Sequence, residues 1–399
     1  MAIVIAPAEI PAFTNYLPVR IGFGEGAAGD LPRVITGRGA STATVMIDAG
    51  LEQQSAGVAA AIVALTDAGV DVDRFVKQPG EPTIDTVDAA TAALKQRPPG
   101  ALVAIGGGSV IDTAKAARLC IQTGLGFRAW LESGRAFPEP TLPLVAIPTT
   151  AGTGSEVSGG AVITDPNETR KVGIAAPTLR AQHALVDPLL TYSVPPLTTA
   201  FTGIDALAQA IAAMIAKTRT PIGDAIALES IRMIGRSLPI ACQDGNDRGA
   251  RSEMACGSMM AGLSMNISDC TAEHSLGQAI GGLFKVPHGL TIGLVLAETL
   301  ERERQHVPDS LERVADALEV PDDGSNDGSR AVRGVRSLLA RLEFPVLRSL
   351  DVTEEHVEPL TALARDDYFH TQSPVPWSDE ELRRVFEVAL AQEERAPVA

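Results

Sequence analysis

The 399-residue chain lacks the marks of several protein classes. Its four cysteines, Cys120, Cys242, Cys256 and Cys270, are scattered without a Cys-x-x-Cys pair, so neither a disulfide framework nor a zinc knuckle is indicated. No basic segment precedes the apolar amino-terminus, as it would in a secretory signal. No run reaches the roughly 18 uninterrupted apolar residues of a transmembrane helix. These absences predict a cytoplasmic protein with reduced thiols and no membrane partner.

Positive charge is also scarce. The chain has 33 Lys and Arg against 49 Asp and Glu, a formal net charge of −16. Such a surface opposes binding to nucleic-acid phosphates or to an anionic membrane. The composition favours an enzyme of small molecules, and the length exceeds what one hydrophobic core usually supports. We therefore expect two domains.

The first half of the chain alternates short apolar runs with helical patterns, which is typical of a parallel sheet with crossover helices. The expected strands cover residues 43–48, 70–76, 101–105 and 144–148, and the expected helices cover 53–68, 83–95 and 110–123. This pattern predicts a Rossmann-like α/β dinucleotide-binding domain over residues 1–192.

After Val194-Pro195-Pro196 the pattern changes, because two successive prolines end regular strand pairing. Helical periodicity then dominates, with expected helices over residues 198–217, 222–242, 250–266 and 274–281. We place the domain boundary between residues 192 and 193, followed by an all-α domain over 193–399.

Two loops follow expected strands and suit a nucleotide. Gly106-Gly107-Gly108-Ser109 lets the backbone approach a pyrophosphate at a helix amino-terminus, although Gly-x-Gly-x-x-Gly is absent and a tight turn explains the glycines equally well. The segment 148–157 offers hydroxyls and backbone amides at another strand end. Asp48 ends an earlier strand, where a carboxylate accepts hydrogen bonds from a ribose and repels a 2′-phosphate. This favours NAD, with NADP left open.

An acid and two histidines indicate metal chemistry. Asp205 with Gln209, and His274 with Gln278, stand four residues apart, so each pair shares one face of a helix. His288 follows in a Pro-His-Gly turn, fourteen residues after His274, in a chain with only six histidines. The alternative is a buried, hydrogen-bonded histidine and a salt-bridged aspartate inside a helical core.

Taken together, these segments resemble the iron-containing, group III alcohol dehydrogenases. The resemblance runs from residues 106–115 through 148–157, 162–165 and 202–207 to 287–289. It implies an α/β dinucleotide-binding domain, a helical domain and an active site in the cleft between them. It also implies an oxidoreductase that transfers hydride between a nicotinamide and the carbon of a small alcohol or aldehyde, and a homodimer or higher homo-oligomer.

By position, the resemblance implies a set of NAD-contacting residues. They are Asp48, Gly107, Gly108, Ser109, Asp112, Thr149, Thr150, Thr153, Val162 and Lys171. Where the family often carries Asn-Pro-Thr, this chain has Glu81-Pro82-Thr83, which puts a carboxylate near the cofactor.

The same comparison implies a metal site formed by Asp205, Gln209, His274 and His288, with Gln209 in place of a family histidine. Gln278 replaces a second family histidine, beside the substrate. An amide oxygen is a weaker ligand than imidazole, yet an aspartate and two histidines meet the three protein ligands that a catalytic metal requires. We therefore expect a divalent metal, Fe(II) or Zn(II), and we list Asp205, His274, His288 and Gln278 as catalytic.

Three other hypotheses remain open. A metal-free NAD(P)H reductase resembling the maleylacetate reductases would follow from loss of the ligand set. A lyase resembling dehydroquinate synthase shares the expected fold and uses NAD transiently. A non-catalytic nucleotide-binding relative has the two glutamines as its only support.

Overall fold

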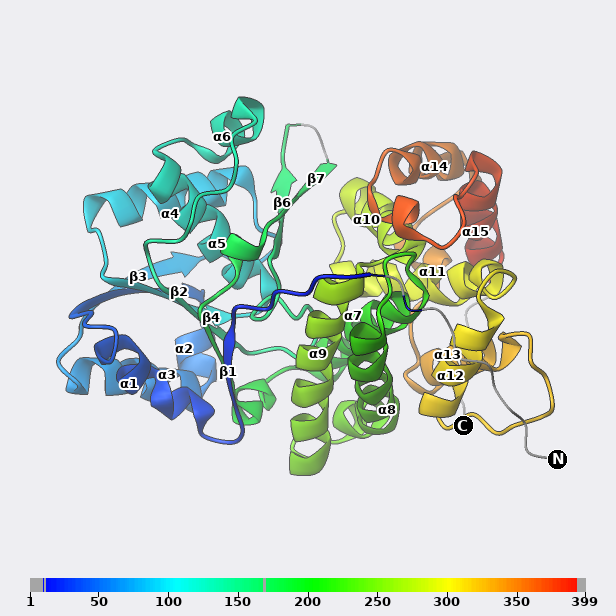
Figure 1. Ribbon diagram of the computed structural model, residues 1–399, viewed down its shortest axis with the longest axis horizontal. Coiled ribbons are helices and arrows are strands. Elements are labelled where there is room, and N and C mark those ends of the chain that lie inside the picture. Colours follow the sequence, from blue (N-terminus) through cyan, green and yellow to red (C-terminus); the bar gives the residue numbers. More distant parts are fainter. Residues whose placement is uncertain (1–9, 11, 168–169, 393–399) are drawn as a thin grey trace.

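A six-stranded parallel sheet forms the centre of the amino-terminal half of the molecule (Figure 1). The structure is a computed structural model that describes residues 10, 12–167 and 170–392. In spatial order the strands are β1 (Arg20–Phe23), β8 (His183–Val186), β5 (Leu144–Pro148), β4 (Ala101–Gly106), β2 (Thr42–Asp48) and β3 (Asp71–Lys77). The chain order reverses between β2 and β4, which is where open α/β sheets bind ligands beyond the strand ends.

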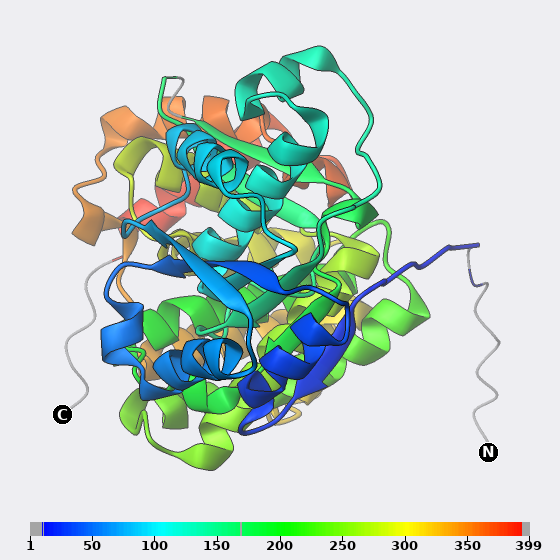
Figure 2. The same cartoon turned by 90° about the vertical axis from the view of Figure 1, so that its left-hand side faces the viewer.

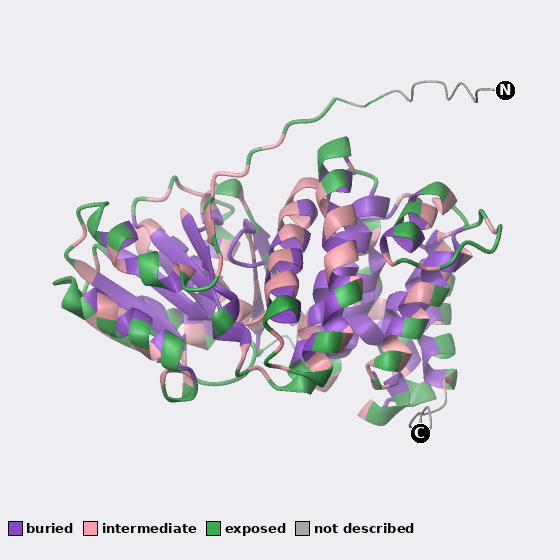
Figure 3. Ribbon diagram, turned by 90° about the horizontal axis from the view of Figure 1, so that it is seen from below, coloured by how far each residue is buried: buried purple, intermediate pink, exposed green. Residues whose placement is uncertain are grey.

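Helices cover both faces of this sheet (Figures 1 and 2). One face carries α1 (Leu31–Thr36), α2 (Leu51–Gln54) and α3 (Ala56–Asp67), and the other carries α4 (Ile84–Gln96), α5 (Gly108–Thr123) and α6 (Phe127–Ser133). Every residue of β4 and β5 is buried, as expected for strands covered on both sides. The sheet therefore separates two apolar cores, one on each of its faces. Figure 3 shows the strands of the sheet largely in the colour of buried residues.

A two-stranded antiparallel hairpin, β6 (Gly160–Asp165) and β7 (Arg170–Ala175), lies between the sheet and the helical half (Figure 1). Its β7 strand contacts the helix α10 (Ala272–Phe284) of the helical half. The backbone N–H of Thr164 donates to the carbonyl of Pro82, 2.8 Å away, which ties the hairpin to the loop before α4. The hairpin thus contacts both halves of the molecule.

The carboxyl-terminal half consists of helices. Besides α10 they are α7 (Pro196–Ile215), α8 (Pro221–Gln243), α9 (Arg248–Ser268), α11 (His288–Glu303), α12 (Pro308–Ala317), α13 (Ser329–Arg341), α14 (Val357–Arg365) and α15 (Asp379–Ala391). The centre is α7, where every residue from Gly203 to Ile215 is buried. Small residues let its neighbours approach closely: a Cβ added at Gly203 would lie 2.3 Å from a Leu238 methyl group. The fold class is the expected one, an α/β half followed by a helical half.

By length and composition, α7 is also the one helix among the described residues that passes a test for a membrane span. Its mean hydropathy over an 18-residue window is 1.3, but 83% of that window is buried inside the molecule. It packs against α8, α9 and α11 and carries the polar side chains of Asp205 and Gln209. It is the core helix of the helical half.

The expected elements differ from the observed ones mainly in the first half. The helix expected over 53–68 is two helices, because Ser55 is extended (φ −126°, ψ 104°) and caps α3 by accepting from the Val58 N–H. The sequence pattern did not predict β1, β8 or the hairpin. The boundary between residues 192 and 193 stays a proposal; it falls between β8 and α7.

Candidate active site

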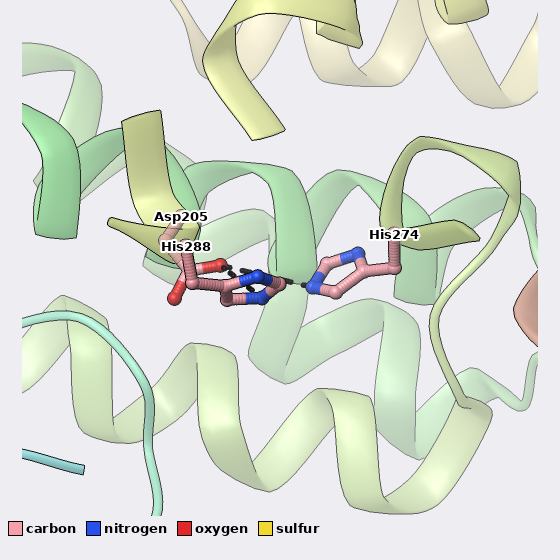
Figure 4. Close-up of side chains that lie close together, drawn as sticks. All are labelled: Asp205, His274 and His288. Carbon is pink, nitrogen blue, oxygen red and sulfur yellow. Dashed lines mark ion pairs between the residues drawn. The ribbon is translucent and has the colours of Figure 1, made fainter. Parts of the chain in front are cut away.

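Three helices bring Asp205, His274 and His288 together in the helical half (Figure 4). The Oδ1 atom of Asp205 lies 3.7 Å from His274 Nε2 and 3.8 Å from His288 Nε2. Ligand atoms around an ion at about 2.1 Å stand about 3.4 Å apart in a tetrahedral site, so these spacings are close to those of a ligand set. The three residues come from α7, α10 and the first turn of α11.

The approach of α11 to α7 depends on Gly289. A Cβ at this position would lie 2.2 Å from the carbonyl oxygen of Phe201 and 3.3 Å from the Asp205 Cβ. No side chain fits in that space, so the glycine lets the start of α11 sit directly on α7. This contact is what places the His288 ring over Asp205.

The polar atoms of this cluster lack partners, which tests whether a cation fits. Among the described residues, Asp205 Oδ1, Gln209 Oε1 and His288 Nδ1 are buried without a hydrogen bond. A buried acceptor with no donor costs free energy unless something else satisfies it. Gln209 is four residues after Asp205 on α7 and is 3% exposed. An orphaned carboxylate oxygen facing two imidazoles, with a second orphaned oxygen one helical turn away, suits a divalent cation, and the donor set fits one.

The electrostatics of the cluster agree with this interpretation. Burial raises the pKa of Asp205 to about 6, although His274, Gln209 and Lys171 oppose the shift. Burial, and then the charges of Lys171 and His274, hold the pKa of His288 well below its usual value. The His288 ring is therefore neutral at pH 7, as a metal ligand must be.

Glu273 orients the His274 ring and was not predicted from the sequence. Its Oε1 atom lies 2.8 Å from His274 Nδ1, and both side chains are buried. Burial lowers the pKa of His274, but Cys270 and Glu273 outweigh it and hold that pKa well above its usual value. A carboxylate that accepts the Nδ1 proton leaves Nε2 free to face Asp205. The only sequence signal for this role is that Glu273 directly precedes a histidine that is a candidate metal ligand.

Gln278 lies one helical turn after His274 on α10 and is partly exposed. The structure gives it no hydrogen bond within the described part of the chain. Its turn of α10 faces β7, because a Cβ at Gly281 would lie 3.7 Å from Lys171 Nζ. Gln278 thus lies beside Asp205, His274 and His288 but is not one of the three residues whose ligand atoms converge.

The first cofactor loop joins β4 to α5 and has no room for side chains. Gly106 has φ +159°, and a Cβ there would lie 2.7 Å from Val110. A Cβ at Gly108 would lie 2.7 Å from the Thr153 hydroxyl, and one at Gly107 would contact Thr150. Gly107 precedes the first turn of α5, next to its unpaired N–H groups. The two loops expected from the sequence therefore pack against each other, with Ser109 partly exposed beside them.

The second loop, which begins with the buried Thr149, is held by Asp112. The Asp112 carboxylate accepts hydrogen bonds from the Ser155 hydroxyl and from the Val162 N–H, the latter at 2.9 Å. Lys115, completely buried on α5, donates to Ser155 and to the Gly160 carbonyl. Asp112 thus shapes the loop and the start of the hairpin, and Val162 reaches a ligand only through its side chain.

Asp48 stands at the end of β2, beside the glycine loop. Its Oδ1 atom lies 3.4 Å from Nζ of Lys77, a buried lysine that also donates to the carbonyls of Gln78 and Gly80. Burial raises the pKa of Asp48, while Lys77 and Gly107 oppose that shift. Lys77 was not predicted, because only the register Asp48↔Lys77 between β2 and β3 brings the two together.

Lys171 on β7 is nearly buried and pairs with Glu81, at 3.4 Å between Nζ and Oε2. Every residue expected to contact the cofactor thus lies on the carboxyl side of the sheet or on the hairpin. The metal-ligand candidates lie on α7, α10 and α11, of which α10 contacts the hairpin.

Two family models match this chain. Residues 18–188 match the iron-containing alcohol dehydrogenase model, and residues 199–390 match the model for the carboxyl-terminal part of the Fe-containing alcohol dehydrogenase family. The chain belongs to the iron-containing alcohol dehydrogenase family. Membership confirms the expected resemblance, the two-part fold and the oxidoreductase class.

Relatives of this family member are similar over nearly their whole length. Choline dehydrogenase of Bacillus subtilis (strain 168) is 34% identical over 360 residues, 89% of either chain. NAD-dependent methanol dehydrogenase of Bacillus methanolicus is 31% identical, over 94% of this chain and 100% of the relative. The crystal structure of sulfoacetaldehyde reductase from Bifidobacterium kashiwanohense in complex with NAD+ is 29% identical, with a TM-score of 0.87, and covers 96% of this chain and 100% of that one.

Proposed function

We propose that this family member is a metal- and NAD-dependent dehydrogenase that interconverts an alcohol and an aldehyde or ketone by hydride transfer. The observation that carries the proposal is the convergence of Asp205, His274 and His288, with orphaned oxygens on Asp205 and on Gln209, one turn further along α7. If these side chains served only to pack the core, their oxygens would be expected to accept hydrogen bonds within the protein. The metal we propose is Fe(II) or Zn(II).

The proposed ligands are two imidazoles, one carboxylate and one amide. Because the pKa of His274 is well above its usual value, its ring would release the Nε2 proton when a cation binds. A divalent ion, when bound there, acts as a Lewis acid toward the oxygen of the substrate. Glu273 holds the Nδ1 proton of His274 and so keeps Nε2 directed at the ion. Gln209 offers a neutral oxygen in place of an imidazole, which lowers the affinity for Zn(II) and Fe(II).

A bound NAD would supply the hydride acceptor for oxidation of the alcohol carbon and, as NADH, the hydride donor for reduction of the carbonyl carbon. We propose that Gly107, Gly108 and Ser109 receive the pyrophosphate, and that Asp48 accepts hydrogen bonds from the adenosine ribose. The threonines Thr149, Thr150 and Thr153, together with Val162 and Lys171, complete the cofactor site. The negative charge of Asp48 favours NAD over NADP.

Gln278 affects proton transfer. An amide donates and accepts hydrogen bonds but does not take up a proton near neutral pH, as an imidazole does. In this chain the alcohol proton would therefore leave through water, through a ribose hydroxyl or through a group of the substrate. Gln278 orients one of these groups.

The names of the relatives leave the charge of the substrate open, because choline is a cation, methanol is neutral and sulfoacetaldehyde carries a sulfonate. We propose a small alcohol or aldehyde as substrate, a cytoplasmic location, and a homodimer or higher homo-oligomer as the assembly.

Metal analysis combined with NADH-coupled assays tests the proposal. Purified protein is expected to carry close to one Fe or Zn per chain, to lose alcohol oxidation on chelation, and to regain it with Fe(II) or Zn(II). The Asp205→Asn variant is expected to lose both metal and turnover. Asp224→Asn, which changes another buried aspartate of the helical half, serves as control and is expected to keep the metal. Full activity after exhaustive chelation would instead establish a metal-free reductase.

A further inference from the structure

The ion pair between Glu81 and Lys171 lies where the β6–β7 hairpin contacts the helical half. Lys171 Nζ lies 3.4 Å from Glu81 Oε2, with the lysine side chain 4% exposed and that of the glutamate 39% exposed. A nearly buried ammonium group requires a partner, because burial disfavours an isolated charge. Glu81 is the partner that the structure gives it.

Backbone contacts fix the position of Glu81. The Gly80 carbonyl before it accepts from the buried Lys77 ammonium at 2.6 Å, and Gly80 has a left-handed φ of +112°. The Pro82 carbonyl after it accepts from Thr164 N–H on β6, whose register partner on β7 is Lys171. Hydrogen bonds of the residues before and after Glu81 therefore hold its carboxylate beside Lys171.

The pair also lies close to the metal-ligand candidates. A Cβ at Gly281, three residues after Gln278 on α10, would be 3.7 Å from Lys171 Nζ. The charge of Lys171 lowers the pKa of both Asp205 and His288, and the charge of Glu81 raises that of Asp205. Lys171, a proposed cofactor contact, is thus also a cation next to α10 whose charge acts on Asp205 and His288, and Glu81 is its counter-charge.

We propose that Glu81 makes this active site selective for uncharged alcohols and aldehydes over anionic ones. An unpaired ammonium at this position would attract a carboxylate or sulfonate on the substrate. With Glu81 in place that attraction is cancelled, and the partly exposed carboxylate itself repels an anion. Glu81 is then a residue that determines specificity, and this inference rests on the proposed dehydrogenase function.

The experiment compares two aldehydes that differ by one charged group. Butanal and 4-oxobutanoate have the same chain, with a methyl group in one and a carboxylate in the other. The metal-loaded enzyme is expected to prefer butanal in kcat/KM. In Glu81→Gln the ratio of butanal to 4-oxobutanoate is expected to fall about tenfold or more, because the charge of Lys171 is then free to attract the carboxylate. High salt is expected to reduce the change.

Glu52→Gln is the matched control. It removes another glutamate of the α/β half, 31% exposed and paired with Arg74 at 3.2 Å on the far side of β3. This variant is expected to keep the ratio of the parent enzyme. An equal change in Glu52→Gln, or an unchanged ratio in Glu81→Gln with only the KM for NAD altered, would overturn the proposal.

A binding measurement separates this inference from the proposed function. The fluorescence of NADH bound to the metal-loaded protein is titrated with butanamide and with 4-amino-4-oxobutanoate, which is the same amide with a terminal carboxylate. Glu81→Gln is expected to strengthen binding of the anionic amide relative to the neutral one, even if neither aldehyde is turned over. Equal relative affinities in parent and variant would refute the role of Glu81. Absence of turnover would refute only the dehydrogenase.

Discussion

His274 Nδ1 lies 2.8 Å from the Oε1 atom of Glu273, the residue next to it in the chain. The other oxygen of the same carboxylate accepts from the Thr271 hydroxyl, and Oε1 also accepts from the Thr271 N–H. Glu273 is therefore held by the first turn of α10 and in turn holds the ring. A rotation of this ring would move Nε2 away from Asp205.

Replacing Glu273 by glutamine tests this relationship. The amide retains the size of the side chain but not its charge, so the ring becomes less basic and less well oriented. We expect the affinity for Zn(II) to fall by roughly 10- to 100-fold, the range seen when such supporting carboxylates are changed. Competition with a chromophoric chelator measures the affinity. Glu298→Gln alters another buried carboxylate of the helical half and is expected to leave the affinity unchanged; a loss in both variants would point to general destabilisation.

Gln209→His is expected to strengthen metal binding. Gln209 Oε1 is buried without a hydrogen bond and lies one turn from Asp205, so a histidine there adds an imidazole to the existing ligands. Because Zn(II) prefers nitrogen to an amide oxygen, we expect its affinity to rise about tenfold or more. Affinity for Mg(II), which prefers oxygen, is expected to fall. If chelator competition gave equal Zn(II) affinities for parent and variant, Gln209 would not be a ligand.

The sequence predicted four of the six strands of the sheet, β2, β3, β4 and β5, but not the four-residue strand β8, although all of its residues are buried. The strands β4 and β5 are continuous apolar runs, and β2 is apolar apart from the buried Thr44 and its two ends, which few other structures explain. The strand β1 is short and partly exposed, and the hairpin mixes buried and partly exposed positions, so neither has a strong pattern. The position of β1 comes from its pairing with β8, and the position of the hairpin comes from the contact of β7 with α10.

The functional residues also divide into those that a local sequence pattern predicted and those that only contacts between elements bring together. Helical spacing predicted that Asp205 and Gln209 share a face, and the resemblance implied that His288 belongs to the same site. The close approach of α11 to α7 at Gly289 was not predicted. Glu273 and Lys77 were not predicted, since one depends on the orientation of a ring and the other on the register between two strands. Contacts between elements are not encoded in the periodicity of either element.

Asp48→Ala is expected to relax the preference for NAD. The carboxylate is 28% exposed at the end of β2, where it repels a 2′-phosphate, and Lys77 beside it is a cation that the substitution leaves in place. We expect the ratio of kcat/KM for NAD to that for NADP to fall at least about tenfold. Initial rates with both cofactors measure it. Asp73→Ala, on the neighbouring strand β3, is expected to keep the ratio; an unchanged ratio in Asp48→Ala would remove this aspartate from the ribose site.

Glu156 is expected to make the folded protein less stable as the pH rises toward neutral. Its side chain is 3% exposed in the second cofactor loop, and burial raises its pKa to about 7 from 4.5, against the influence of its own backbone N–H and of Lys115. The folded chain therefore keeps a proton that the unfolded chain releases between these two values. The stabilisation is complete below pH 4.5 and is lost as the pH passes 7.

Denaturant unfolding of the parent and of Glu156→Gln measures this contribution. Glutamine keeps the shape of the protonated acid but does not titrate, so the variant is expected to match the parent near pH 5 and to be more stable at pH 8. The gain in the free energy of unfolding at pH 8 is expected to be at most roughly 3 kcal/mol, from the size of the pKa shift. Above pH 8 the buried Lys115, whose pKa burial lowers to about 8, acts in the opposite direction, so the comparison is made at pH 5, 6, 7 and 8. A variant that is less stable than the parent at pH 8 would mean that the Glu156 carboxylate is charged in the folded protein and stabilises it through Lys115.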